Sequence, residues 1–417
     1  MVARSQVPSL TRRRLLATAA AGAVAVTVRG GPAAAGRPGG TLGDGERLYD
    51  VVVDYSRWRH HRTGTGLGTA TTRFFQHELR KRGADADRWP YAVDLFDWSA
   101  HVRVGRTSIP TLPLYYEAVG QARSDSPFIR SVTLPNAATV TELQGAIDAA
   151  AAAGASVAVI PTFGFFPAIP GVAHLPFGPY GALIGVNVEP HGPRSGVHTL
   201  LVSGEHADRV AAGPTRASVR SRIVAGSAEL VTAWFHQPVP DPVIVTTPLT
   251  GWFTCAGERG TGIAIALDLA AELAASGEPV FVLGTTSHEF ENFGIAQYLA
   301  ANSLTPRAVI HIGASAAAGV RNDNGGLDLA PLRLWNSTVP TDALSTAMAG
   351  GGWLRIPQFL GEGTMWAAAL PSGTPLLSIS GSFPLFHTPQ DTPAAATDPQ
   401  LLATAYQALR SAADVLL

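Results

Sequence analysis

The stretch of sequence that decides the fold runs from residue 242 to residue 313. Short apolar segments there alternate with longer ones: PVIVT (242–246), TGIAIALDLAAELAAS (261–276), PVFVLGT (279–285), FGIAQYLAAN (293–302) and AVIHIG (308–313). Their lengths and residue types predict strands and helices in turn, with one more strand at 375–379 and a closing helix at 399–416. This alternation is typical of a mostly parallel central sheet with helices on both faces. Binding sites in such sheets form at the carboxyl ends of the strands.

Upstream of this stretch the pattern changes. Residues 118–237 combine an alanine-rich helix at 140–153 with short buried-type strands and loops rich in Gly, Pro and Phe. We therefore predict a small β-rich domain inserted at 118–237. The segments on either side, 46–117 and 238–417, would together form the α/β domain.

The N-terminus has the features of an export signal. Arg12, Arg13 and Arg14 precede a mildly apolar, alanine-rich run at 15–28, and a small-residue cleavage site follows at 33–35. We interpret residues 1–35 as a twin-arginine signal peptide, and 36–45 as a flexible glycine-rich lead-in. An uncleaved anchor or a disordered basic arm is the alternative. The signal predicts a secreted or periplasmic protein, and no later stretch is apolar enough to span a membrane.

Composition narrows the classes of partner. The formal net charge is -1 and only 15% of the residues are charged, which argues against a nucleic-acid-binding surface. We expect a small-molecule or peptide substrate. The single cysteine, Cys255, excludes an internal disulfide, so core burial must stabilise the fold. The sequence leaves the oligomeric state open.

Four segments carry a resemblance to a known family. They are HRTGT at 61–65, the inserted region at 118–237, the strand, loop and helix at 242–270, and HTPQDT at 387–392. Together they resemble the exported zinc aminopeptidases, a family that includes the glutaminyl cyclases and often contains an inserted protease-associated domain. The resemblance implies an aminopeptidase-like fold and a peptide or N-acyl amide as substrate.

The chain departs from this family at the metal ligands. Where the family has His-x-Asp after its first core strand, this chain has Pro248-Leu249-Thr250. The position of the family's bridging Asp, which contacts the metal, falls on Gly257, with Glu258 beside it. The family's Glu-Glu pair appears as His288-Glu289, and its next Asp falls near Gly313, two residues after His311. The last ligand is kept as His387.

Two clear matches, Glu289 and His387, are fewer than the three protein ligands of a catalytic zinc. We therefore expect no cofactor. A single zinc held by Glu289 and His387, joined by Glu258, His288 or His311, is the alternative.

Reactive side chains nevertheless gather at the predicted edge of the sheet. We predict that Glu258, His288, Glu289 and His387 carry out acid-base chemistry. Substrate contacts would come from Arg259, Trp252, Cys255, Glu362 and Asp391. Most of these residues also have a simpler structural interpretation. Glu258 and Arg259 could form an ion pair, His288 and Glu289 could begin a helix, and Trp252 and Cys255 could be part of the hydrophobic core. Cys255 could also be a nucleophile with His288 or His387 as its base.

Three functional hypotheses follow. The first is an exported aminopeptidase-like enzyme with a remodelled, metal-independent site. The second is a non-catalytic protein that captures a peptide or glycan outside the cell. The third is a conventional zinc aminopeptidase whose ligands align differently.

Overall fold

The computed structural model describes residues 42–133, 141–163 and 195–417 apart from residue 291. The predicted signal peptide and residues 36–41 of the lead-in lie outside these ranges. Helix α2 (Leu42–Tyr55) begins inside the lead-in, so the expectation of a flexible segment is wrong for residues 42–45. Gly45 lets this helix pack closely against the closing helix, because a Cβ there would lie 2.0 Å from the carbonyl oxygen of Pro399.

The main sheet has ten strands, and its four central strands run parallel. Its order is β16 (Leu354–Arg355), β15 (Leu332–Ser337), β17 (Leu376–Ser382), β12 (Ala308–Ile312), β10 (Val243–Pro248), β11 (Val280–Thr285), β9 (Thr215–Phe235), β1 (Asp85–Val104) and β2 (Thr107–Ile109), with β4 (Gly120–Ser124) paired to β9. The predicted α/β class is confirmed.

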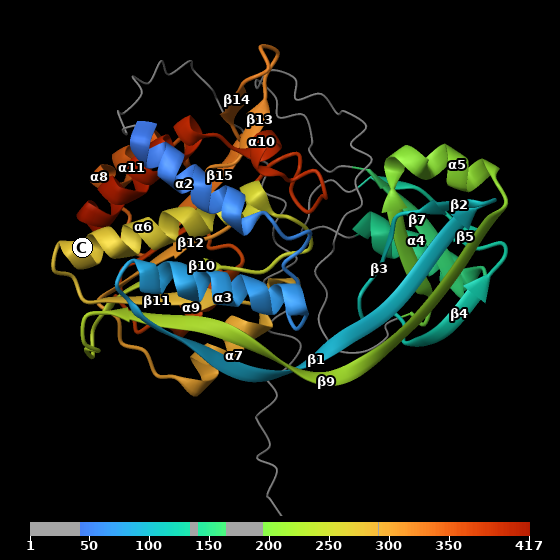
Figure 1. Cartoon of the computed structure of the whole chain (residues 1–417), viewed down its shortest axis with the longest axis horizontal. Helices are drawn as coiled ribbons and strands as arrows, with labels where there is room; N and C mark the ends of the chain where they lie inside the picture. The colour runs from blue at the N-terminus through green and yellow to red at the C-terminus, as the bar shows by residue number, and fades with distance from the viewer. Residues whose placement is uncertain (1–41, 134–140, 164–194, 291) are drawn as a thin grey trace, which may run out of the picture.

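Helices cover both faces of the main sheet (Figure 1). One face carries α2, α3 (Gly66–Lys81), α6 (Thr261–Ala275), α8 (Asp342–Gly350) and α11 (Pro399–Leu416). The other face carries α7 (Phe293–Ala301) and α9 (Glu362–Ala369), which contact each other. Since both faces are covered, the residues of β10, β11 and β12 are buried throughout.

A long antiparallel ribbon joins this layer to a second sheet (Figure 1). Strands β1 and β9 pair along their whole lengths, from Asp85 opposite Trp234 to Val104 opposite Thr215. The second sheet contains β3 (Thr111–Pro113), β5 (Phe128–Ile129), β6 (Val132–Thr133), β7 (Val157–Phe163) and β8 (His198–Ser203), with helices α4 (Thr141–Ala152) and α5 (Ala207–Ala212). Since the ribbon runs into both parts, the inserted-domain boundaries at 118 and 237 stay a prediction.

Local signals place most of the predicted elements within a few residues. Helix α3 begins at Gly66 because the Thr65 side chain accepts a hydrogen bond from the Gly68 N–H. Helix α11 has the predicted bounds, with the Asp398 side chain capping the N–H of Leu401. No helix in the described ranges is long and apolar enough to cross a membrane.

Candidate active site

Three of the predicted catalytic side chains meet at the carboxyl edge of the main sheet. Glu258 lies in the turn between β10 and α6, His288 in the turn after β11, and His387 in the loop after β17. One ligand-type atom from each lies within 4.8 Å of the others. Glu258 and His387 are 129 positions apart in the chain, and the fold thus brings one carboxylate and two imidazoles together.

The loops that present these side chains have unusual backbone conformations. Residues Ala256–Gly260 form a π-helical turn, in which the N–H groups of Arg259 and Gly260 both donate to the carbonyl of Cys255. Cys255 and His387 adopt the left-handed conformation, with φ of 52° and 58°. The left-handed conformation is unfavourable for residues other than glycine. Both it and π-helical turns occur frequently at functional sites.

Glu258 lies between a guanidinium and an imidazole. Its Oε1 is 2.9 Å from Nη2 of Arg259 and 3.2 Å from Nε2 of His387. The three side chains are 0%, 1% and 2% exposed. Burial by itself would raise the pKa of Glu258, but the adjacent His387 and Arg259 side chains outweigh burial and lower it. Glu258 is therefore a carboxylate at neutral pH.

These contacts are close but are not aligned as hydrogen bonds. Among the described residues, both carboxylate oxygens of Glu258, both Nη atoms of Arg259 and both ring nitrogens of His387 have no hydrogen-bond partner. Buried polar atoms are nearly always paired with protein or ordered water. Beyond their ion contacts with one another, these atoms therefore keep hydrogen-bonding capacity that the described residues do not use.

Arg259 is held in place by the first site loop. Its Nε donates to the carbonyl oxygen of Thr250 at 3.0 Å, which fixes the plane of the guanidinium. Its Nη2 then lies 2.9 Å from Oε1 of Glu258. A fixed, water-excluded guanidinium is suited to bind an anionic group or a developing negative charge.

His288 is the one partly exposed member of the cluster. Its Nδ1 lies 2.7 Å from Oδ1 of Asn292, an acceptor, so Nδ1 carries the hydrogen and Nε2 keeps its lone pair. Burial and the nearby Arg259 charge lower the pKa of His288 well below its ordinary value. A neutral imidazole with a free Nε2 can accept a proton.

Asp391 ties the last site loop to the first. Its Oδ1 accepts the N–H of Gly257 at 2.6 Å, and its Oδ2 accepts the N–H of Glu258 at 3.0 Å. At Gly257, where the resemblance places the bridging metal ligand, a Cβ would lie 2.7 Å from the ring of Phe383. A side chain therefore has no room at that position.

Glu289 lies outside the three-residue cluster. Its carboxylate accepts hydrogen bonds from the N–H of Thr63 (3.1 Å) and from the hydroxyls of Thr63 (3.1 Å) and Thr250 (2.9 Å). Burial raises its pKa and these bonds partly reverse the shift. The sequence marks the segments that contain Thr63 and Thr250 but predicts no role for either threonine, because nothing in those segments indicates a carboxylate partner.

Glu362 and His311 form a separate buried pair. Both oxygens of Glu362 accept from the hydroxyl of Thr285 at 2.7 Å, and its Oε2 lies 3.7 Å from Nε2 of His311. Nδ1 of His311 lies 2.8 Å from the hydroxyl oxygen of Ser378. Burial raises the pKa of Glu362 to about 7 and lowers that of His311 to about 3.

Trp252 and Cys255 are both buried. Trp252 packs edge-on against Tyr115, with ring centroids 4.6 Å apart, and thereby connects the first site loop to the segment that follows β3. The Cys255 thiol has a pKa raised well above its ordinary value, first by burial and then by Glu258 and Asp391. A thiol with a raised pKa is a poor nucleophile.

No protein-family model and no curated protein matches the sequence. Several solved structures, however, are similar to this chain in fold. The zinc aminopeptidase from Bacillus subtilis superimposes with a TM-score of 0.63 at 13% identity, over 88% of this chain and 94% of that one. The fold is that of the zinc aminopeptidases. The peptidase M28 precursor from Shewanella amazonensis is similar too, with a TM-score of 0.62 at 16% identity, over 90% of this chain and 96% of that one.

The metal ligands that the family resemblance implies do not fit these residues. Gly257 has no side chain, Glu289 is bonded to two threonines, and His311 is paired with Ser378. Glu258, His288 and His387 could hold one metal ion by their spacing, and this set differs from the Glu289 and His387 expected from sequence. The Arg259 guanidinium, however, lies 2.9 Å from the only carboxylate of the set.

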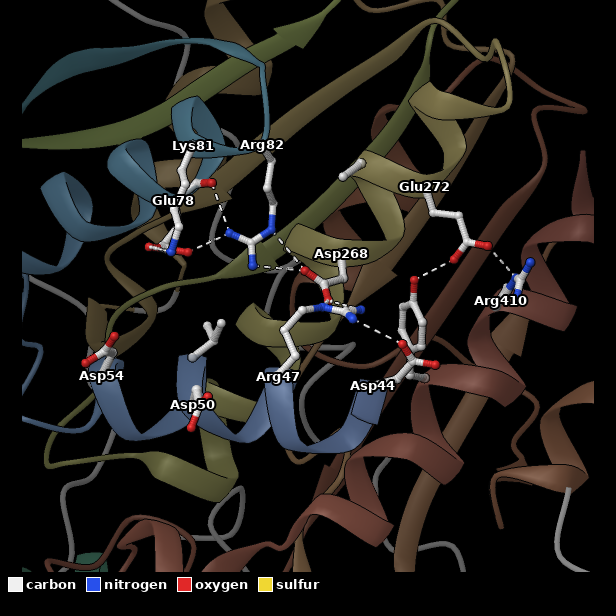
Figure 2. A pocket seen from close by; sticks show the side chains of 13 residues that line it. Asp44, Arg47, Asp50, Asp54, Glu78, Lys81, Arg82, Asp268, Glu272 and Arg410 are labelled. Atoms are coloured by element: carbon white, nitrogen blue, oxygen red, sulfur yellow. Dashed lines mark hydrogen bonds and ion pairs between the residues drawn. The ribbon is translucent and has the colours of Figure 1, made fainter. Parts of the chain in front are cut away.

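A cavity of about 670 Å³ lies elsewhere, between α2, α3, α6 and α11, and no predicted site residue lines it. Figure 2 shows Arg47 and Arg82 both reaching the carboxylate of Asp268, at 2.8 and 2.9 Å. Arg82 also pairs with Glu78 at 2.6 Å. These ion pairs satisfy one another, which favours a structural role in joining helices.

Proposed function

We propose that this chain is an aminopeptidase-like hydrolase that cleaves a peptide or an N-acyl amide at a metal-independent centre. The centre would consist of Glu258, Arg259, His288 and His387. The observation that carries the proposal is the buried cluster at the carboxyl edge of the sheet, in which Glu258 lies 2.9 Å from Arg259 and 3.2 Å from His387. Beyond these ion contacts, the polar atoms have no hydrogen-bond partner among the described residues, so they retain the capacity to bond a substrate.

In this proposal His288 is the general base. Asn292 holds its Nδ1–H at 2.7 Å, so the lone pair of Nε2 can take a proton from an attacking water. The lowered pKa keeps the ring neutral, although burial makes it a weak base. Its partial exposure makes it the member of the cluster that a substrate reaches first.

Arg259 would stabilise the negative charge that develops on the carbonyl oxygen. Its guanidinium is anchored on Thr250 and is excluded from water, so it needs no reorganisation when that charge forms. Glu258 keeps the guanidinium in place, and His387 would deliver a proton to the leaving nitrogen. Asp391 and Glu289 would act as positioning residues, because both bind loop backbone or hydroxyls.

Export is part of the same proposal. We propose that residues 1–35 direct the folded chain through the twin-arginine route, so that it works outside the cytoplasm. Replacing Arg12 and Arg13 by lysines should retain the protein in the cytoplasmic fraction. Appearance of this variant outside the cell at the wild-type level would contradict the route.

The test of function is a screen of the mature chain against aminoacyl anilides, glutaminyl peptides and N-acyl amides. We expect turnover that survives a metal chelator and falls at least about 100-fold in the His288→Ala and Arg259→Met variants. His206→Ala is the matched control, since His206 directly precedes α5 beside the second sheet and contacts Glu205, not the proposed centre. Unchanged turnover in His288→Ala would overturn the proposed centre.

A binding protein is the second candidate. Glu258, Arg259 and His387 are almost completely buried, and side chains that a substrate does not reach cannot catalyse its cleavage. Peptide or glycan binding without turnover of any substrate in the screen would support it. About two zinc ions per purified chain would instead support a conventional metallopeptidase.

A further inference from the structure

The cluster at the carboxyl edge has the composition of a metal site. It offers one carboxylate and two imidazoles, whose ligand atoms lie within 4.8 Å of one another. Three protein ligands of these types are the usual complement of a catalytic zinc. The oxygens of Glu258 and the ring nitrogens of His387 have no hydrogen-bond partner in the described ranges, and their only close polar contacts are the ion contacts of Glu258 Oε1 with Arg259 and His387.

A cation already lies beside this set. Nη2 of Arg259 is 2.9 Å from Oε1 of Glu258, and the side chain is 1% exposed. The guanidinium cannot easily swing away, because its Nε is bonded to the carbonyl of Thr250 and its backbone belongs to the π-helical turn. Solvent and salt screen a buried charge much less than an exposed one.

We propose that the Arg259 guanidinium takes the place of a metal ion in this site and keeps the native chain free of zinc. It neutralises Glu258, the only carboxylate of the set. It also repels any dication that approaches the same oxygen, and this repulsion is strong in a buried, poorly polarisable environment. The metal site is therefore latent, and removal of one positive charge should expose it.

This inference goes beyond the proposed function, since it concerns cation binding and uses no turnover measurement. A chain that hydrolyses nothing could still contain the latent site. Equally, a metal-independent hydrolase could lack it. The two proposals can therefore fail separately.

The experiment measures zinc binding by calorimetry in the metal-free chain and in Arg259→Met. We expect Arg259→Met to bind one zinc per chain at least about 100-fold more tightly than the wild type. Cobalt should give the visible absorption bands of a nitrogen and oxygen site in this variant. Zinc should also raise its unfolding temperature, because binding stabilises the folded state.

Two controls separate the latent site from incidental binding. Arg333→Met removes another fully buried arginine, whose Nη2 bonds the carbonyl of Ala316 and whose guanidinium lies 4.1 Å from the Trp353 ring centroid. This variant should gain no zinc site. The double variant Arg259→Met with His387→Ala should lose the site again.

Equal zinc affinity in the wild type and a folded Arg259→Met variant would overturn the proposal. If Arg259→Met does not fold, the wild type decides the question. Stoichiometric micromolar zinc binding that His387→Ala abolishes would show that the arginine does not exclude the metal. Weak binding that is indifferent to His387→Ala would support exclusion.

Discussion

The carboxyl group of Asp391 holds the backbone of Glu258, with Oδ2 accepting the Glu258 N–H at 3.0 Å. Its Oδ1 accepts the neighbouring N–H of Gly257 at 2.6 Å. The two residues are 133 positions apart in the chain, so this contact joins the last site loop to the first. The position of Glu258 relative to His387 therefore depends on Asp391, which lies four residues after that histidine.

Asp391→Asn should destabilise the fold by about 1–3 kcal/mol, because one backbone N–H would face an amide NH2 in a buried place. Turnover should fall as well, since Glu258 loses its support. Denaturant unfolding and steady-state kinetics measure the two effects. Asp398→Asn is the matched control: Asp398 caps α11 through the N–H of Leu401, and its loss should cost stability at most, with turnover intact.

The pH dependence of stability should contain a contribution from Glu362. Its ordinary pKa is 4.5, and burial raises it to about 7 in the folded state. Between these values the folded chain binds a proton that the unfolded chain has released, so stability falls as pH rises through this window and levels off above it. The loss is about 3 kcal/mol.

Glu362→Gln removes this titration. Between pH 5 and 7.5 the free energy of unfolding should fall by about 2 kcal/mol more in the wild type than in this variant. Taking the difference between the two proteins removes the contribution of the other titrating groups to the pH dependence of the free energy of unfolding. Parallel curves for the two proteins would mean that Glu362 is ionised in the folded state throughout.

Cys255 should be inert toward thiol reagents in the native protein. It is 1% exposed, and burial together with Glu258 and Asp391 raises the pKa of its thiol. Alkylation followed by mass spectrometry is unambiguous, because the chain contains one cysteine. One label per chain should appear in denaturant, and almost none without it. Rapid labelling of the folded protein would restore Cys255 as a candidate nucleophile.

Glu289→Gln should show whether this carboxylate positions loops or takes part in the reaction. Because Glu289 accepts bonds from Thr63 and Thr250, we expect a stability loss of about 1–3 kcal/mol and a similar pH profile for the remaining turnover. Glu117→Gln is the control, a buried carboxylate that accepts the Ser195 N–H at 3.0 Å. Loss of turnover with unchanged stability would instead make Glu289 catalytic, as the sequence predicts.

The sequence by itself determined the fold class. Alternating apolar segments at 242–313 predict β10, α6, β11, α7 and β12 within two residues at most ends, because hydrophobic periodicity and end signals are local. The same logic places the site at the strand ends. It does not give the length of β1 and β9, since a ribbon that serves two sheets has no single buried face to mark its pattern.

Only the tertiary structure decided which of the predicted site residues meet. Glu258, His288 and His387 converge, whereas the adjacent Glu289 turns to Thr63 and Thr250, and Glu362 pairs with His311. Neighbours in sequence such as His288 and Glu289 can point to different partners because a short turn sends successive side chains in different directions. The close approach of Arg259 to Glu258 likewise depends on a π-helical turn and on the Thr250 carbonyl, and neither has a sequence signature.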